Sequence, residues 1–317
     1  TMEINDSSWE DFILVGFSEY PKAEFIISLF VTGFYTMTLA GNMAIILVSI
    51  LDSQLHTPMY FFLRNLSFLD ISFTTCIVPQ MLVNIWSGHK TISYVGCIVQ
   101  YSVALALGSI ECVLLAVMAV DRYVAVIWPL RYATIMHQQI CHLLAATSWL
   151  SGFANSLFQS SLAIILPLCG HHHVDHFFCE VLVIVKLSCV DTGSTESKML
   201  IARLLIIVVP VYIILTSYAC IAGTVVRIPS AEGRQKAFGT CASHLMVVLL
   251  FYGTIMFMYL QPKNNYSQNQ GKILALVYTI VAPTMNPLIY SLRNKDVKRA
   301  MRKVIWKDLV ERRHERY

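Results

Sequence analysis

An acid and an arginine stand side by side as Asp121 and Arg122, where a long apolar run that begins near Ser93 comes to its end. Charged side chains are costly inside a bilayer, so this pair is expected at a boundary between membrane and water. Arg122 can hold Asp121, or release it and bind a protein that docks on the same face, as a conformational switch requires. On spacing alone, an arginine that only anchors a helix end explains the pattern equally well.

Other polar side chains lie deep within apolar runs. Asp70 lies about twelve residues into its run, which is about 18 Å at 1.5 Å per residue. Glu111 and Asn286 lie at comparable depth in two further runs, and Asn42 follows Gly41 in the first. A buried carboxylate in a membrane is a functional candidate, and the alternative is a protonated acid that is only hydrogen-bonded.

The elements that position these residues follow from composition. The chain has 317 residues, of which 56% are hydrophobic and 13% charged, and its mean hydropathy of +0.61 excludes a soluble globular protein. Apolar windows long enough to span a bilayer, roughly 20 residues each, predict an all-α membrane protein with a seven-transmembrane helix bundle. The windows are 25–50, 58–82, 93–127, 140–166, 198–227, 237–260 and 272–291.

Charge sets the orientation of the bundle. Of the 23 Lys and Arg residues, 16 fall on one side of the predicted spans and 7 on the other, so the N-terminus is predicted outside. The domains expected are an outer tail (1–24), a seven-transmembrane domain (25–291) and a cytoplasmic segment (292–317). In the last, Val297, Met301, Val304 and Ile305 share one helical face opposite basic residues, which predicts a short interfacial helix on membrane lipid. The net charge of +4 is a topology signal, and no nucleic-acid partner is expected.

Four of the nine cysteines cluster on the predicted outer side, where disulfides persist. They are Cys97, Cys169, Cys179 and Cys189, and they allow three pairings. The other five lie within spans and are interpreted as small apolar residues. Asn5 begins an Asn-Asp-Ser sequon in the outer tail, so we expect glycosylation there.

The outer loop also holds His171, His172, His173, His176 and Glu180, residue types that bind copper or zinc. We expect no functional metal there, because the neighbouring Cys179 is expected in a disulfide and surface histidines bind metals weakly without purpose.

The sequence has no motif of an enzyme: it lacks a zincin helix, a phosphate-binding glycine loop and a serine elbow. A retinal-based light sensor would need a lysine within the seventh span, where Lys272 lies only at the outer end. A biogenic-amine receptor would need an acid near Ala104. A membrane transporter is the remaining alternative, although seven spans do not divide into paired repeats.

The stretch Met118–Leu130 resembles the signature Met-Ala-Tyr-Asp-Arg-Tyr-Val-Ala-Ile-Cys-x-Pro-Leu of vertebrate olfactory receptors, a branch of the rhodopsin-like class A G-protein-coupled receptors. Val120 replaces the Tyr of this signature and Ile127 its Cys, while the core Asp121–Tyr123 is intact. Residues 55–70 resemble the first inner loop and second span of the same family, and residues 229–244 its third inner loop and sixth span. A non-olfactory chemosensory receptor of the same fold is the closest alternative.

The resemblance implies functional roles for many of these residues. It implies the disulfides Cys97–Cys179 and Cys169–Cys189, and a sodium ion or polar cluster near Asp70 and Glu111. It also implies a stimulatory, olfactory-type heterotrimeric G protein, a volatile odorant and a plasma-membrane location in sensory cilia. The switch residues implied are Asp121, Arg122, Tyr123, Tyr218, Lys236 and Tyr290, with the Tyr218 hydroxyl meeting Arg122 in the active state.

The ligand pocket is expected in the outer half of the bundle, because the inner half is committed to the switch. On the third span one helical face presents Tyr101, Ala104, Leu105, Gly108, Ser109 and Cys112. The residues expected opposite are Ile206, Tyr252, Ile255, Tyr259 and Thr279. Each of these can also serve only helix packing, but together they form an apolar pocket with few polar anchors, suited to small volatile molecules.

Arg203 departs from the apolar pattern of the fifth span, seven residues before Pro210. If it turns inward, its fixed charge favours carboxylates or strong hydrogen-bond acceptors among the ligands. The preferred expectation is that it reaches outward to the headgroups, or pairs with Glu180 or Glu196.

Overall fold

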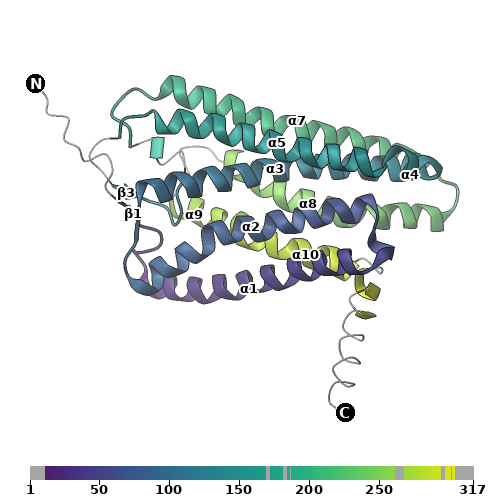
Figure 1. The fold of residues 1–317 in the computed structure, drawn as a ribbon, viewed down its shortest axis with the longest axis horizontal. Coiled ribbons are helices and arrows are strands. Elements are labelled where there is room, and N and C mark those ends of the chain that lie inside the picture. Colours follow the sequence, from purple (N-terminus) through teal and green to yellow (C-terminus); the bar gives the residue numbers. More distant parts are fainter. Residues whose placement is uncertain are drawn as a thin grey trace, which may run out of the picture.

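The computed structural model describes residues 11–168, 172–180, 184–185, 187–260, 268–293, 297–300 and 302–303. Within these residues seven helical columns run side by side, one for each predicted span (Figure 1). The columns are α1 (Pro21–Leu51), α2 (Pro58–Ser87), α3 (Tyr94–Ile127), α5 (Gln138–Ile164), α7 (Gly193–Val226), α8 (Ala231–Leu260) and a composite of α9 (Gln268–Leu276), the π-helical turn η4 (Val277–Val281) and α10 (Ala282–Arg293).

Local signals explain where several of these helices begin and end. Pro21 and Pro58 occupy first helical positions, where a missing N–H costs nothing. Ser93 caps α3, because its hydroxyl accepts a hydrogen bond from the Gly96 amide at 3.1 Å. Gly88 ends α2 with a φ of +71°, a left-handed conformation that glycine adopts without strain.

Five helices of the described residues are long and apolar enough to cross a membrane, or six if the bent pair within α8 counts as one span. The predicted fourth span, now α5, is not among them. Its hydropathy is lowered by polar residues that the bundle buries, such as Ser148, Gln159 and Ser160. This helix therefore hides its polar groups against its neighbours, while Leu150 and Leu157 are more than two-thirds exposed on the outside.

Helix α3 lies at the centre of the bundle. In α3, 72% of the most apolar window is buried, compared with 22% for α7, whose apolar residues face outward. Gly152 lets α5 approach α3 closely, since a Cβ there would lie 2.7 Å from the Ile110 backbone nitrogen. The outward apolar faces suit lipid, and the tightly packed centre is where polar groups can be satisfied by protein.

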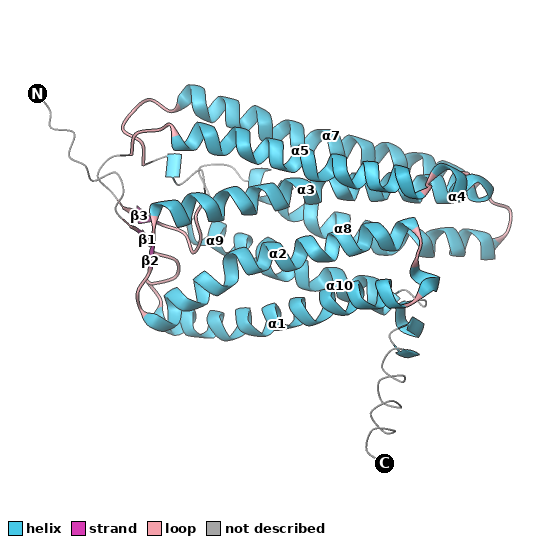
Figure 2. Ribbon diagram, in the orientation of Figure 1, coloured by secondary structure: helices cyan, strands magenta, loops and turns pink. Residues whose placement is uncertain are grey.

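A small sheet closes the outer end of the bundle (Figure 2). Strand β1 (Phe12–Leu14) lies between β2 (Thr91–Ile92) and β3 (His173–Val174), antiparallel to the first and parallel to the second. The segment expected to be a tail therefore contributes a strand, because its alternating Phe12 and Leu14 bury against the outer loop.

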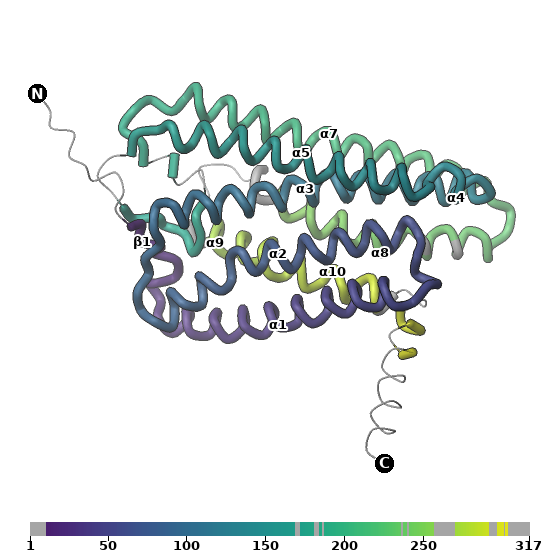
Figure 3. Tube along the Cα trace, in the orientation of Figure 1, coloured from purple at the N-terminus to yellow at the C-terminus, as the bar shows by residue number. Residues whose placement is uncertain are grey.

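The opposite end carries the short elements η1 (Ser53–Leu55), η2 (Pro129–Arg131) and α4 (Tyr132–Ile135). Beyond α10 the described residues 297–300 and 302–303 are helical, as Figure 3 traces. Val297 and Ala300 are buried while Lys298, Arg299 and Lys303 are exposed. The other residues of the predicted apolar face, Met301, Val304 and Ile305, lie outside the described residues, so the interfacial helix stays a prediction. Lys303 lies 3.8 Å from the Asp52 carboxylate, so this helix is tied to the end of α1.

Candidate functional site

A cavity of about 180 Å³ opens in the outer half of the bundle, between α2, α3, α7, α8, η4 and the loop that follows α5. Most of the ligand residues predicted from the sequence line it. They are Tyr101, Ala104, Leu105, Gly108, Ser109, Cys112, Arg203, Ile206 and Ile255. The predicted face of the third span is therefore the face that borders the cavity.

Two predicted ligand residues do not line the cavity. The Tyr252 hydroxyl donates to the Cys112 carbonyl at 2.9 Å, and Phe251 borders the cavity in its place. Thr279 is fully buried and donates to the Ala275 carbonyl, while Tyr278 borders the cavity. A further predicted ligand residue, Tyr259, has a side chain that lies outside the described residues.

The outer loop supplies lining residues that the sequence did not assign to the pocket. Phe178 and Glu180 flank Cys179, whose disulfide to Cys97 of α3 is present, as the resemblance implied. The Cys179 amide also donates to the Gln100 side-chain oxygen at 3.0 Å. The predicted disulfide could have revealed these two lining residues, because it holds Phe178 and Glu180 over the cavity. Cys189 is also disulfide-bonded, and its predicted partner Cys169 lies outside the described residues.

A larger apolar groove, about 750 Å³, runs along the outside of the bundle between α3, α5 and α7. Its walls include Leu205 and Val209, which are at least half exposed. On this flank lipid chains can fill it, so the smaller cavity, with its convergent polar groups, is the candidate ligand site.

A chain of side-chain hydrogen bonds crosses from α7 through α5 to α3 beside the cavity. Arg203 Nε donates to Gln159 Oε1 at 3.0 Å, Gln159 Nε2 to Asn155 Oδ1 at 3.1 Å, and Asn155 Nδ2 to Ser109 Oγ at 2.8 Å. The expectation that Arg203 reaches the headgroups is wrong, because its side chain is buried against Gln159. The expected pairing with Glu180 or Glu196 is also absent from the ion pairs of the described residues.

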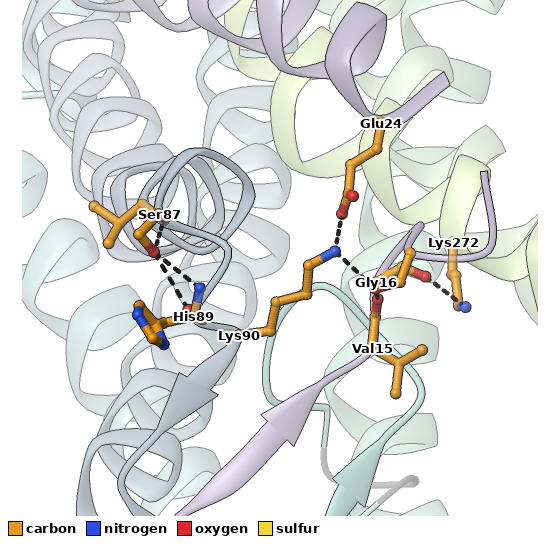
Figure 4. A network of polar contacts seen from close by, with 9 residues as sticks. Val15, Gly16, Glu24, Ser87, His89, Lys90 and Lys272 are labelled. Carbon is orange, nitrogen blue, oxygen red and sulfur yellow. Dashed lines mark hydrogen bonds and ion pairs between the residues drawn. The ribbon is translucent and has the colours of Figure 1, made fainter. Parts of the chain in front are cut away.

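The N-terminal segment (residues 11–20) and the outer loop (residues 172–180) form a cap over the cavity. Two lysines hold this cap in place (Figure 4). Lys90 donates to the Glu24 carboxylate at 2.5 Å and to the Ser18 hydroxyl at 2.7 Å. Lys272 is buried, donates to the Gly16 carbonyl at 2.7 Å, and forms an ion pair with Asp175 of the outer loop. The N-terminal segment, the outer loop and the last helical column are thus tied together.

His176 lies beneath this cap, packed against Phe177 and Phe178. Burial, and then the positive charge of Lys272, lower the pKa of His176 to about 3. Glu180 lies 3.7 Å from the ring and favours its charged form, but at that distance it does not offset the burial. The ring is therefore neutral at physiological pH.

We predict that the cap opens more often as the pH falls from 7 to 5. His176 gains a proton near pH 6.5 when exposed but only near pH 3 when buried, so the stability it contributes is lost as the pH falls between those values. At pH 5 the loss is about 2 kcal/mol, or a roughly 30-fold lower protection factor once amide exchange is corrected for its own slower rate at low pH. Hydrogen exchange of residues 13, 15 and 16, whose amides donate to carbonyls of this loop, measures it. His176→Phe should remove that loss of protection, and an unchanged pH dependence in this variant would refute the assignment.

The other histidines of the outer loop have packing or sheet positions. His172 lies against Phe12, with ring centroids 6.2 Å apart, and His173 forms part of β3. His171 lies outside the described residues. The expectation that they bind no functional metal stays a prediction.

The expected polar cluster forms in the middle of the bundle. Asn286 Nδ2 lies 3.1 Å from both carboxylate oxygens of Asp70, joining α2 to α10. Asn42 Nδ2 donates to the Pro283 carbonyl at 3.1 Å, joining α1 to the same helix. Glu111 lies at the floor of the cavity and interacts electrostatically with Asp70.

At the inner end Arg122 and Asp121 form the expected ion pair, and both side chains are buried. The pair has a third member that the sequence did not reveal. The hydroxyl of Tyr132, from the short helix α4, donates to Asp121 Oδ1 at 2.7 Å. Burial and the charge of Asp121 raise the pKa of Tyr132, so the phenol stays a donor. This arrangement holds the inner loop and α3 together while Arg122 is engaged.

A second group of hydrogen bonds joins α3, α7 and α8. His244 Nε2 lies 3.1 Å from the Leu115 carbonyl, which only accepts, so this nitrogen must carry the proton. Its Nδ1 then accepts from the Tyr218 hydroxyl at 2.7 Å. Tyr218, expected to meet Arg122 in an active state, is here held by His244, a residue that sequence reasoning had not assigned.

The remaining predicted switch residues are distributed around this end. Tyr123 packs edge-on against Trp128, with ring centroids 5.4 Å apart. The Tyr290 hydroxyl is buried without a hydrogen-bond partner among the described residues. The side chain of Lys236 and the predicted glycosylation site Asn5 lie outside the described residues.

Comparisons with known proteins agree with this geometry. The family model described as "Olfactory receptor" matches residues 31–308. Olfactory receptor 2G6 of Homo sapiens is 57% identical over 303 residues, covering 96% of each chain. Olfactory receptor 2G3 of Homo sapiens is 54% identical over 301 residues, covering 95% of this chain and 97% of its own. The crystal structure of squid rhodopsin superposes with a TM-score of 0.69 at 16% identity, covering 89% of this chain and 80% of the other, so the two share the fold.

Proposed function

The chain belongs to the olfactory receptor family, and we propose that its outer cavity binds small volatile odorants and that its inner face activates a stimulatory heterotrimeric G protein, raising cyclic AMP. It is a multi-pass membrane receptor and not an enzyme. Family membership also removes the transporter alternative. We further propose that the receptor acts in the plasma membrane of sensory cilia, with its capped end outside the cell, as the distribution of lysine and arginine indicates.

The observation that carries this proposal is that one helix reaches both sites. Ser109 borders the cavity and Arg122 forms the inner ion pair, and both belong to α3. Thirteen residues separate them, about 20 Å along a helix. A ligand that shifts α3 or its neighbours therefore acts on the ion pair through a rigid element.

Between the two sites α8 is attached to α3 by two hydrogen bonds. Tyr252 donates to the Cys112 carbonyl, and His244 donates to the Leu115 carbonyl. Cys112 also lines the cavity. An odorant that binds better when α8 has moved away from α3 breaks these bonds, frees Tyr218 from His244, and favours release of Arg122. This is a population shift between two states of the bundle.

A cyclic AMP assay on a chemically diverse odorant panel tests the proposal, with Gly108→Leu as the structural probe. Gly108 borders the cavity, and a Cβ there meets no atom within 4 Å, so a leucine projects into the space the ligand needs. Larger odorants should lose about 10-fold or more in potency, as expected for a pocket that no longer fits its ligand. The smallest agonists should lose least.

The matched control is Gly33→Leu, which also meets no atom within 4 Å but lies exposed on α1. Its odorant ranking should equal that of the wild type. If both variants reach the cell surface and Gly108→Leu keeps the wild-type ranking, the cavity is not the odorant site. If no odorant raises cyclic AMP, the proposed coupling fails.

The sodium ion expected near Asp70 and Glu111 stays a prediction. Two carboxylates in electrostatic contact favour one shared positive charge, which a proton or a sodium ion can supply. Asn286 already donates to both oxygens of Asp70, so a cation has to compete with that amide.

A further inference from the structure

Arg203 presents an unused hydrogen-bond donor beside the cavity. The residue is 9% exposed and its Nε donates to Gln159, but the buried Nη2 has no hydrogen-bond partner in the described part of the chain. Nor does any carboxylate of the described residues form an ion pair with it. Leaving a guanidinium N–H unpaired in a buried site is costly. A group that accepts from Nη2 is therefore missing from this wall of the cavity.

The hydrogen-bond chain that starts at Arg203 fixes the direction of every donor along it. A guanidinium only donates, so the oxygen of Gln159 must face Arg203 and its nitrogen must face Asn155. Asn155 in turn must accept with its oxygen and donate with its nitrogen, which points at the Ser109 oxygen. Ser109 therefore acts as an acceptor toward α5.

This direction leaves the Ser109 hydroxyl proton without an acceptor among the described residues. Ser109 borders the cavity, as Arg203 does. The chain thus ends in two donors on the cavity wall, one charged and one neutral, surrounded by apolar residues such as Leu105, Ile206 and Ile255. No described residue accepts from Arg203 Nη2 or from the Ser109 hydroxyl, and a ligand can.

We propose that the receptor is selective for small odorants that carry a carboxylate or another strong hydrogen-bond acceptor, which binds Arg203 Nη2 and the Ser109 hydroxyl. This inference rests on the proposed odorant role of the cavity. The apolar part of such a ligand fills the rest of the cavity, and its acceptor neutralises the buried charge. A primary amine brings a second positive charge toward Arg203 and is disfavoured.

The two acids that also line the cavity do not reverse this preference. Glu180 lies at the outer rim, beside His176, with its side chain about a third exposed. Glu111 lies at the floor in electrostatic contact with Asp70. Arg203 is the cationic residue of the described lining, and its buried Nη2 has no hydrogen-bond partner among the described residues.

Straight-chain carboxylic acids of three to ten carbons, with the methyl esters, alcohols and amines of matched length, test the proposal on the full-length receptor by cyclic AMP. In the wild type the acids should be more potent than the amines at every active length. Arg203→Met should lower the potency of the acids by about 10- to 100-fold, the range expected for a charge-assisted hydrogen bond. The alcohols should change less.

Ser109→Ala is the second variant and removes only the neutral donor. It should lower the acid potency by about 5- to 10-fold, and the ratio of acid to alcohol potency corrects for any general change in the cavity. Lys198→Met is the matched control, since it removes an exposed cation from the same helix. It should leave every ranking unchanged.

Three outcomes would overturn the proposal that the ligand carries a hydrogen-bond acceptor. The amines could be as potent as the acids, or the acids could keep their potency in both Arg203→Met and Ser109→Ala. The third is that the acids are inactive while other odorants of the diverse panel activate the receptor. In each of these the odorant role of the cavity stands. If instead the receptor reaches the cell surface and responds to neither panel, the proposed function is wrong, and this inference is wrong with it.

Discussion

Arg122→Ala should abolish G-protein activation while odorant binding in the outer cavity is retained. Arg122 is buried at the inner end, where it pairs with Asp121, and in the proposed mechanism it is the group released toward the G protein. About 20 Å of α3 separates it from the cavity, so its loss leaves the ligand contacts intact. Cyclic AMP after odorant addition, with surface expression measured in the same cells, is the readout.

The partners of Arg122 should behave in the opposite way. Asp121→Asn removes the charge that holds Arg122 and should raise basal cyclic AMP by about 5-fold or more, the lower end of ordinary coupling energies. Tyr132→Phe removes only the hydroxyl that donates to Asp121 and should raise it less. Arg64→Ala, an arginine of α2 stacked on Phe61, serves as the control and should signal normally. Wild-type signalling by surface-expressed Arg122→Ala would contradict the switch.

Loss of the Cys97–Cys179 disulfide should be the most damaging change at the outer end. The bond joins α3 to the loop that caps the cavity, across a sequence separation of 82 residues. A native disulfide contributes about 2–5 kcal/mol, a large part of the stability of a typical fold. Cys97→Ser and Cys179→Ser should therefore each reduce surface expression strongly, as measured by antibody labelling of intact cells.

The double variant distinguishes loss of this bond from other damage. Both single changes break the same bond, so Cys97→Ser with Cys179→Ser should resemble either one alone. Cys220→Ser is the matched control, because Cys220 is free and exposed on α7. Strictly additive losses of Cys97 and Cys179 would mean that the two residues act separately.

The membrane spans were largely predictable because their signal is local. The third span was predicted at 93–127 and α3 is found at Tyr94–Ile127, since a bilayer demands one long apolar run per helix. The adjacent Asp121 and Arg122 were predictable for the same reason: neighbours in sequence are neighbours in space. The face of α3 that borders the cavity also followed from helical spacing alone.

The residue of the seventh span that borders the cavity was predicted wrongly, at a place where the helix itself changes. The turn η4 is π-helical, and its wider turn shifts the phase of the residues around it. Tyr278 therefore borders the cavity in place of the predicted Thr279. The strand β1 was not predicted, because its partners His173 and Ile92 lie far along the chain and its own three residues carry a weak signal.

The charged and polar residues inside the apolar chain, among them Asp70, Glu111, Arg122 and Arg203, can be read directly from the sequence. The partner that each of them contacts depends on the packing of the helices. Arg203 turns to Gln159 of α5 and not to the headgroups, and Tyr132 of an inner loop joins Asp121. Hydrophobic periodicity fixes which helices form and which faces are buried, but hydrogen bonds between helices depend on how those helices pack, and that is set by the whole bundle.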